Sequence, residues 1–326
     1  MNAPLPVGVI GVGALGQHHA RHLASLEDAH LVGVYDIDAA VARRVADEVG
    51  TAAAPSLEAL LADVEAVSIA VPTTDHGAVG LEVLRRGIPV FIEKPLAATL
   101  EEADALVHAA DQVGVQLQVG HIERFNRAIR AATPYLDNPL YLESQRVAPF
   151  QPRGTDVAVV LDLMIHDLDL ILHLTGGVEA LGVQASGIAV LSRHLDIVNA
   201  RVEFANGAVA NATASRLARD RVRRLRLFQP SGYLSLDLAQ GTGAFMRLKP
   251  NWRPGTATKL EDVVEQIPLE APDADALLLE LQSFVHAVRG DHEAVVTGHQ
   301  GRQALALAIR VSEAVERSPV ERFSTT

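Results

Sequence analysis

The chain has 326 residues, 48% of them hydrophobic, which predicts two globular domains. It has no cysteine, which excludes disulfides, thiolate metal sites and a Cys nucleophile. Its 40 acidic residues outnumber its 28 Lys and Arg, a formal net charge of −12, so we expect no nucleic-acid partner, because such surfaces concentrate basic residues. No signal peptide is visible. Apolar segments such as 157–174 are interrupted by charged residues, so none reaches the ~20 apolar residues that span a bilayer. We therefore expect a soluble cytoplasmic protein with no membrane contact.

The first part of the chain alternates short β-branched runs with helical segments. In chain order, the expected elements are strand 7–10, helix 14–26, strand 31–35, helix 39–49, strand 66–71, helix 75–86, strand 90–92, helix 100–113 and strand 116–119. Continuous apolar strands separated by helices indicate a parallel sheet with both faces covered. We therefore predict a doubly wound α/β domain over residues 1–121.

From residue 122 onward the pattern changes. The expected elements are helix 124–132, strand 140–147, helix 159–174, strands 198–204, 209–215, 223–228 and 233–238, a surface loop at 250–258, and helices 274–289 and 300–317. Asn206-Gly207 separates two of these strands and tolerates positive φ, which suits a tight hairpin. We therefore predict a second domain over residues 122–326 with a mainly antiparallel sheet.

A glycine-rich sequence, Gly11-Val-Gly13-Ala14-Leu15-Gly16, lies between the first strand and the first helix. Glycines at these positions permit a tight turn, a close approach of the backbone to a pyrophosphate, and close packing of helix and strand. The N-terminus of the helix adds N–H groups and a positive dipole end. The motif predicts a dinucleotide site, although a glycine-rich turn without a ligand would have a similar sequence.

Asp36 ends the second strand, 20 residues beyond Gly16. A carboxylate at this place accepts hydrogen bonds from the adenosine ribose and repels a 2′-phosphate, which favours NAD over NADP. Arg43 and Arg44 could instead hold a 2′-phosphate, but within a helix they are more typical of a solvated basic face.

Two more loops follow strands at the edge where ligands of open α/β sheets bind. The fourth strand runs into Pro72 and Thr73, where the chain is expected to pass beside the cofactor, or simply to turn. Glu93-Lys94-Pro95 follows strand 90–92, and both Glu93 and Lys94 are expected among the cofactor contacts. Its lysine could hold a substrate hydroxyl and polarise the developing carbonyl, whereas its other interpretation is an ordinary surface lysine.

Asp162 and His166 are four residues apart and are expected to share one face of a helix. A carboxylate beside an imidazole can orient it and produce a base that accepts a hydroxyl proton near neutral pH. The pair could also be a core histidine with its partner, or one end of a metal site. On the first helix, His18 and His22 could form half a metal site, but with His19 they are expected to be solvated, and we predict no metal.

With the glycine loop, Asp36, Glu93-Lys94-Pro95 and Asp162-x-x-x-His166 in this order, the chain resembles the Gfo/Idh/MocA oxidoreductase family over nearly its full length. The resemblance implies a Rossmann domain that binds NAD(P), followed by an α/β domain with a large, open antiparallel sheet for substrate binding and oligomerisation. It also implies oxidation or reduction of a sugar or cyclitol CH–OH group. In these reactions Lys94 and His166 would handle the proton and Asp162 would assist.

Two segments, 120–126 and 160–169, are similar to the branch of this family that acts as UDP-N-acetylglucosamine 3-dehydrogenases. That similarity implies a nucleotide-sugar substrate, whose diphosphate requires cationic donors. The candidate donors are Arg124, Arg153 and Arg216, each of which could also be an ordinary surface arginine. Asn126 could bind a sugar hydroxyl or could terminate local structure.

Two other functions compete with nucleotide-sugar oxidation. One is a free-sugar or inositol dehydrogenase, and the other is a non-catalytic NAD-binding regulator, against which the set Lys94, Asp162 and His166 argues. We expect a homodimer or homotetramer through the sheet of the second domain. The redox assignment requires that Lys94 and His166 converge on the nicotinamide.

Overall fold

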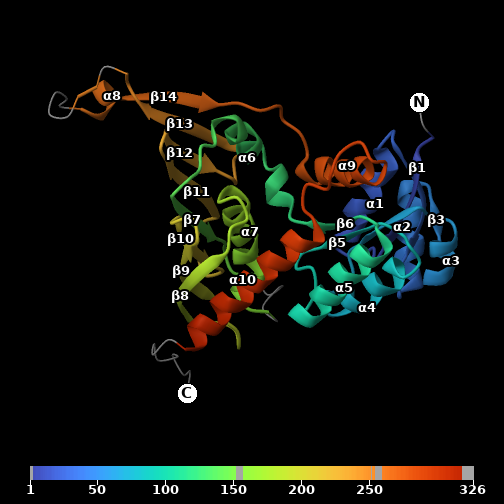
Figure 1. Ribbon diagram of the computed structural model, residues 1–326. Helices are drawn as coiled ribbons and strands as arrows, with labels where there is room; N and C mark the ends of the chain where they lie inside the picture. The colour runs from blue at the N-terminus through green and yellow to red at the C-terminus, as the bar shows by residue number, and fades with distance from the viewer. Residues whose placement is uncertain (1–2, 152–156, 251, 254–258, 318–326) are drawn as a thin grey trace. The chain divides into compact units, whose positions relative to one another are not determined.

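A computed structural model describes residues 3–151, 157–250, 252–253 and 259–317 of the chain. The chain forms two compact units, each with its own sheet (Figure 1). Unit 1 comprises Met1–Ile122 and Ala274–Leu305, and unit 2 comprises Glu123–Asp273 and Ala306–Thr326. In the described residues, no helix has both the length and the apolar character needed to cross a membrane.

Unit 1 contains a six-stranded sheet in which all neighbours are parallel. Its strands are β1 (Leu5–Ile10), β2 (Ala29–Tyr35), β3 (Ala52–Ala53), β4 (Ala66–Ile69), β5 (Val90–Glu93) and β6 (Leu117–Gly120). Their order in the sheet is β3-β2-β1-β4-β5-β6. From β1 the chain adds strands first on one side and then, starting with β4, on the other side. The carboxyl ends of these two strands therefore form the switch point where open α/β sheets bind ligands.

Helices cover both faces of this sheet, with α1 and α9 on one face and α4 and α5 on the other (Figure 1). The helices of unit 1 are α1 (Gly16–Ser25), α2 (Ala39–Val49), α3 (Leu57–Ala62), α4 (Thr73–Leu84), α5 (Leu100–Val113), α9 (Ala276–Val288) and the first turns of α10 (Gly298–Glu316). The sequence predicted α2 to the residue because both caps are local. Asp38 Oδ1 accepts a hydrogen bond from the Ala40 N–H at 2.9 Å, and Gly50 ends the helix at φ +73°.

The division into units differs from the predicted domains in one respect, because residues 274–305 belong with unit 1. In α9, Leu281 and Phe284 are buried in the same core as Leu23 of α1 and Phe91 of β5. The rings of Phe284 and Phe91 lie 5.9 Å apart. The spacing of the apolar residues in α9 predicts a helix with one buried face, but spacing does not identify the surface on which that face packs.

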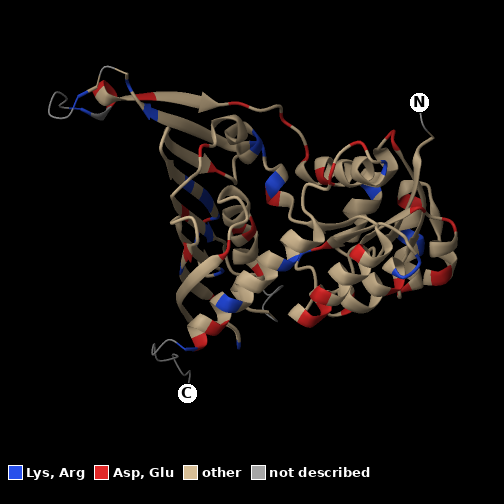
Figure 2. Cartoon of the chain, viewed as in Figure 1, with Lys and Arg blue, Asp and Glu red and all other residues tan. Residues whose placement is uncertain are grey.

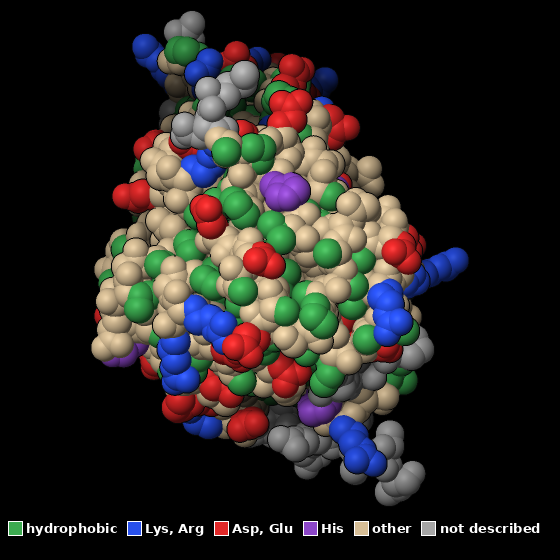
Figure 3. Space-filling view, turned by 90° about the vertical axis from the view of Figure 1, so that its right-hand side faces the viewer, with side chains coloured by type: hydrophobic (Ala, Val, Ile, Leu, Met, Phe, Trp, Pro, Cys, Tyr) green, Lys and Arg blue, Asp and Glu red, His purple; other side chains and the backbone are tan. Residues whose placement is uncertain are grey.

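Charged residues of both signs are interspersed along the elements of each unit (Figure 2). On the face drawn in Figure 3, the described Lys and Arg side chains are scattered among acidic and apolar ones. That face therefore carries charges of both signs and not one continuous basic surface.

Unit 2 contains an eight-stranded sheet that is antiparallel except for the β7–β10 pair. Its strands are β7 (Tyr141–Val147), β8 (Ala180–Ile188), β9 (Ile197–Phe204), β10 (Val209–Ser215), β11 (Val222–Gln229), β12 (Gly232–Asp237), β13 (Thr242–Leu248) and β14 (Val264–Leu269), in the order β14-β13-β12-β11-β7-β10-β9-β8. The predicted hairpin β9–β10 is confirmed, with Gly207 at φ +84° and the Asn206 side chain accepting from the Ala208 N–H at 3.1 Å. Together the two sheets confirm the predicted fold class.

The two predicted helices at 124–132 and 159–174 are each divided in unit 2. The helical segments of this unit are the 3-10 turns η1 (Ile122–Phe125) and η2 (Thr133–Tyr135), α6 (Arg127–Ala132), the π turn η3 (Val160–Met164), α7 (Ile165–Leu174), α8 (Leu260–Val263) and the later turns of α10. Helix 124–132 is divided because Asn126 caps α6, its Oδ1 accepting from the Ala128 N–H at 3.0 Å. Of the predicted surface loop, residues 251 and 254–258 lie outside the described part of the chain.

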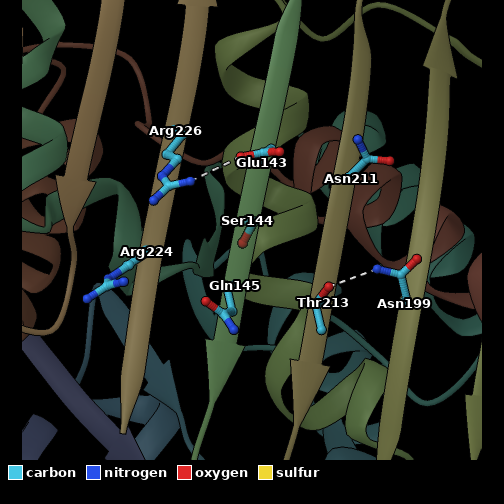
Figure 4. A pocket seen from close by; sticks show the side chains of 8 residues that line it. All are labelled: Glu143, Ser144, Gln145, Asn199, Asn211, Thr213, Arg224 and Arg226. Carbon is cyan, nitrogen blue, oxygen red and sulfur yellow. Dashed lines mark hydrogen bonds and ion pairs between the residues drawn. The ribbon is translucent and has the colours of Figure 1, made fainter.

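One face of this sheet is turned away from α7 and is largely polar. Because Arg146 of β7 contacts α7, its neighbours Glu143 and Gln145 point to the opposite face. Glu143 pairs there with Arg226 at 3.5 Å (Figure 4). A hollow of about 300 Å³ on this face is lined by Glu143, Ser144, Gln145, Asn199, Asn211, Thr213, Arg224 and Arg226. Oligomerisation through this sheet stays a prediction.

Candidate active site

The glycine loop of unit 1 has the packing that a dinucleotide site requires. Gly11 has φ +78°, and a Cβ there would lie 2.7 Å from Cγ1 of Val71. A Cβ on Gly16 would collide with the carbonyl oxygen of Gly11, so α1 packs tightly against the end of β1. A Cβ on Gly13, in contrast, would meet nothing within 4 Å. The first and third glycines are therefore needed by the fold, and the second leaves open space beside exposed backbone, which fits a bound pyrophosphate.

Asp36 holds the end of β2 against this loop. One carboxylate oxygen accepts a hydrogen bond from the Val12 N–H at 2.8 Å, and the other accepts from the Asp38 N–H at 3.0 Å. The carboxylate lies beside the glycine loop as the sequence predicted, and its role toward the ribose stays a prediction. Arg44 pairs with Glu48 at 2.8 Å, and both side chains are about half exposed, as expected of a solvated helix face.

The loops after β4 and β5 are joined by a buried histidine. Strand β4 ends at Ile69, and Pro72 caps α4, which begins at Thr73. His76, in the first turns of α4, places one ring nitrogen 3.0 Å from the Val71 carbonyl and the other 2.9 Å from the Pro95 carbonyl. This residue was not predicted, because nothing in the sequence shows that the first turns of α4 lie beside Pro95.

Glu93 lies inside unit 1 and connects Lys94 to α1. Its Oε1 lies 3.1 Å from Nε2 of His19, whose Nδ1 lies 2.8 Å from the Ser68 hydroxyl, and its Oε2 accepts from the Lys94 N–H at 3.1 Å. Burial opposes ionisation of Glu93, but the His19 hydrogen bond and the nearby His19 and Lys94 charges together hold its pKa below the usual value. Lys94 itself is half-buried.

Both Glu93 oxygens have partners within the protein, as both Asp36 oxygens do, and the role of Glu93 toward the cofactor stays a prediction. This geometry corrects one expectation. His19 was expected to be solvated, but it is fully buried because it shares the sheet-facing side of α1 with Gly16, Ala20 and Leu23. The spacing of these four residues was the signal in the sequence that could have revealed its burial.

Asp162 and His166 lie on consecutive turns of unit 2. Asp162 is in the π turn η3 and His166 is in the first turn of α7, and both are half-buried. A π turn is uncommon and occurs frequently at functional sites. Met164 and Ile165 between them are fully buried and anchor this segment. Their pairing, and the convergence of His166 with Lys94 of unit 1, stay predictions.

The residues that follow His166 form buried ion pairs. Asp169 accepts two hydrogen bonds from Arg124, at 2.8 and 2.7 Å. Asp167 accepts two from Arg146, at 2.7 and 3.1 Å, and Arg146 also donates to Glu123 at 2.8 Å. All five side chains are at least nine-tenths buried. The two segments that resemble nucleotide-sugar dehydrogenases therefore bind each other through charge.

These contacts show what the candidate substrate residues bind within unit 2, and their roles toward a substrate stay predictions. Arg124, a candidate diphosphate donor, is buried and donates two hydrogen bonds to Asp169. Asn126 caps α6 and also donates to Glu123 and to the Leu238 carbonyl, each at 2.9 Å, so it terminates local structure. Arg216 is buried and donates to the Val157 carbonyl at 2.6 Å. Arg153 lies outside the described residues.

Within each unit, the structure thus brings together residues that lie apart in the sequence. In unit 1, the glycine loop and Asp36 are joined, and Glu93 links the Lys94 backbone to α1. In unit 2, buried arginines support the helix that carries His166. Among the described residues, no group of three or more His, Cys, Asp or Glu is arranged to hold a metal ion.

Comparison with known proteins gives two matching family models. Residues 5–121 match an oxidoreductase family with an NAD-binding Rossmann fold, Gfo/Idh/MocA. Residues 143–235 match the C-terminal domain model of the same family.

Individual relatives agree with the family models. A UDP-N-acetylglucosamine 3-dehydrogenase from Acidithiobacillus ferrooxidans is 40% identical over 314 residues, which cover 95% of this chain and 96% of the relative. A solved structure of this dehydrogenase, GnnA, has a TM-score of 0.89 and covers 96% of this chain and 97% of that one. A scyllo-inositol 2-dehydrogenase (NAD(+)) from Bacillus subtilis is 31% identical over 64% of this chain and 66% of its own.

A second solved structure supports the fold alone. It is GenD2 from gentamicin A biosynthesis in complex with NAD, with a TM-score of 0.80 at 20% identity, covering 97% of this chain and 95% of that one. The family models cover both units, and the 40%-identical relative spans nearly the whole chain. The chain therefore belongs to the Gfo/Idh/MocA family of NAD-binding oxidoreductases, as its motifs predicted.

Proposed function

We propose that the protein oxidises the 3-hydroxyl of a UDP-linked N-acetylhexosamine with NAD. The observation that carries this proposal is the length of the similarity. The UDP-N-acetylglucosamine 3-dehydrogenase matches 95% of the chain at 40% identity, whereas inositol dehydrogenases match 53% to 64% of it at 31% to 36% identity. The nucleotide-sugar relative is therefore similar in the second unit as well as in the Rossmann unit.

The cofactor would lie against the glycine loop. The backbone of Gly13, Ala14 and Leu15 would hold its pyrophosphate at the N-terminus of α1, and Asp36 would hold the adenosine ribose. Pro72 and Thr73 would approach it from the loop after β4. When NAD is bound, its nicotinamide accepts the hydride that leaves the sugar carbon.

Three side chains would supply the remaining chemistry. Lys94 holds the hydroxyl oxygen with its ammonium group and stabilises the negative charge that develops there. His166 takes the hydroxyl proton on a ring nitrogen, and Asp162 orients the imidazole and stabilises its positive charge. The alcohol thereby loses one hydride from carbon and one proton from oxygen, and a carbonyl remains.

Replacing Asp36 should weaken the preference for NAD. Asp36→Ser removes the carboxylate that accepts ribose hydrogen bonds and repels a 2′-phosphate, so we expect the NAD:NADP ratio of kcat/KM to fall about 10- to 100-fold, about 1.4 to 2.8 kcal/mol. Steady-state kinetics with both cofactors measure this ratio. Asp38→Ser is the matched control, because it removes the same charge two residues away and serine still caps α2. An equal effect of both substitutions would argue against a ribose contact by Asp36.

The substrate class can be tested without turnover. If the substrate is UDP-linked, UDP alone should raise the melting temperature, because a ligand that binds the folded state stabilises it by about 2.7 kcal/mol at about 100 times its Kd. Differential scanning fluorimetry with UDP, inorganic pyrophosphate and myo-inositol measures the shift. Stabilisation by UDP but not by myo-inositol is the expected result.

The second candidate function is oxidation of a free sugar or inositol, which the partial similarity to inositol dehydrogenases favours. Stabilisation by myo-inositol without any effect of UDP would support it and would contradict the nucleotide-sugar assignment. The increase of NADH absorbance with UDP-sugars and with free polyols, offered separately, then identifies the substrate.

A further inference from the structure

His76 occupies an unusual place in unit 1. Its side chain is 1% exposed, and its ring lies between the carbonyl of Val71, after β4, and the carbonyl of Pro95, directly after Lys94. The cofactor chemistry proposed above uses no proton from this residue. It is a buried polar side chain that contacts both loops of the candidate site.

A hydrogen bond from His76 matters more for the carbonyl of Pro95 than for the carbonyl of Val71. The hydrogen bond between Nδ1 and Pro95 O is buried, whereas the contact between Nε2 and Val71 O is partly buried. A buried carbonyl oxygen without a donor is costly, and a partly exposed one can bind water instead. Both carbonyls can only accept, so the contacts at 2.9 Å and 3.0 Å each call for a ring N–H, and a neutral ring can supply it to only one of them.

The ring carries one proton near neutral pH. Burial lowers the pKa of His76, and the carbonyls of Pro95 and Val71 only partly oppose that effect. A neutral imidazole donates from one nitrogen, so its two contacts are not equivalent. The more deeply buried acceptor, Pro95 O, should receive the hydrogen bond.

We propose that His76 is a positioning residue for Lys94, acting through a hydrogen bond from its Nδ1–H to the carbonyl of Pro95. The proposal rests on the function proposed for Lys94. The backbone around Lys94 is then held on both sides, since Glu93 accepts from the Lys94 N–H and His76 fixes the Pro95–Leu96 peptide, one residue further along the chain. A displacement of a reacting group by about 1 Å can cost two orders of magnitude in rate, so this contact should affect kcat.

Two substitutions separate the contacts of His76. The amide nitrogen of His76→Asn stands near the position of Nδ1 and can still donate to Pro95 O. The amide nitrogen of His76→Gln stands near the position of Nε2 and can donate to Val71 O instead. We expect kcat to be at least tenfold lower in H76Q than in H76N, with the KM for the sugar changed by less than about threefold in both.

A spectroscopic measurement reports on Lys94 without cofactor or substrate. The chain has three lysines, Lys94, Lys249 and Lys259, so reductive ¹³C-methylation followed by NMR gives three lysine signals, and Lys94→Arg assigns one of them. Because Lys249 and Lys259 are exposed, Lys94 should have a distinct signal. We expect this signal to stay near its wild-type position in H76N and to move toward the exposed lysines in H76Q.

Val83→Ala is the control for lost packing, because Val83 is a fully buried residue of the same helix that lies outside the site. It should lower the melting temperature while the Lys94 signal stays unchanged. The proposal is overturned if H76N and H76Q have the same kcat and the same Lys94 signal, or if V83A moves that signal as H76Q does. If the proposed substrate is wrong, the NMR result is unaffected. Failure of the proposed function and failure of the His76 proposal can therefore be distinguished.

A measurement on the wild-type protein does not depend on the folding of any variant. With ¹⁵N-labelled histidine, the ring nitrogens of His76 should show a proton on Nδ1 and none on Nε2 at pH 7. An unprotonated Nδ1 would mean that no hydrogen bond reaches Pro95, and the proposal would be wrong.

Discussion

Lys94→Met should lower kcat by about 10³-fold while NAD still binds, because methionine keeps an unbranched side chain as far as Cε and removes the ammonium. A single proton-transfer or charge-stabilising group contributes about 10² to 10⁴ in rate, and both roles are proposed for Lys94. Steady-state kinetics measure the loss of turnover. Calorimetric titration with NAD shows whether the cofactor site is intact, and we expect its Kd to change by less than about threefold.

Lys249→Met is the matched control for this substitution. Lys249 is an exposed lysine of unit 2 whose ammonium donates to the Glu261 carbonyl at 2.7 Å. Its replacement removes the same charge and should leave kcat unchanged. Wild-type activity in Lys94→Met would remove Lys94 from the mechanism, and equal losses in both variants would point to a general effect of charge.

The second large effect concerns stability. Arg146→Met should lower the free energy of unfolding by about 3 to 5 kcal/mol, because it leaves the Asp167 carboxylate buried without its counter-charge and leaves Glu123 with only Arg223, at 3.3 Å. Burial of Arg146 disfavours its charge, but these two carboxylates outweigh that effect and raise the pKa of Arg146 above its usual value. Urea unfolding followed by circular dichroism measures the loss.

Arg226→Met provides the comparison on the opposite face of the same sheet. Arg226 pairs with Glu143 of β7 at 3.5 Å, but both side chains are more than 40% exposed. Exposed pairs are worth about 0 to 1 kcal/mol, so this variant should unfold close to the wild type. If the two arginine variants lose similar stability, the buried network is not what stabilises α7 on the sheet.

The elements that the sequence predicted best are those whose signals are local. Helix α2 carries its caps, Asp38 and Gly50, within its own sequence, and the β9–β10 hairpin carries Asn206-Gly207 at its turn. Strands β3, β8, β13 and β14 and helices α3 and α8 were not predicted. Strand β3 has two residues, and β8 contains Gly182 and Gly187, so each lacks a clear apolar alternation.

The candidate site divides in the same way. The glycine loop and Asp36 were predicted because strand, turn, helix and acidic residue follow one another in a fixed spacing. The partner of Arg124 was not, because an arginine in a loop-like segment has the same local sequence whether or not a buried Asp169 lies beside it, 45 residues away in the chain. His19 and His76 were missed because their partners come from other strands and loops.

The sequence by itself determined the fold class, the family and the order of the motifs, since apolar periodicity, glycine spacing and turn residues act over short stretches of chain. Only the tertiary structure decided that α9 completes the core of unit 1, that Glu93 faces His19, and that Asp167 and Asp169 bind buried arginines. The physical reason is that burial and charge pairing depend on which segments meet in space. A side chain's local sequence describes its chemistry, but its partner is supplied by the fold.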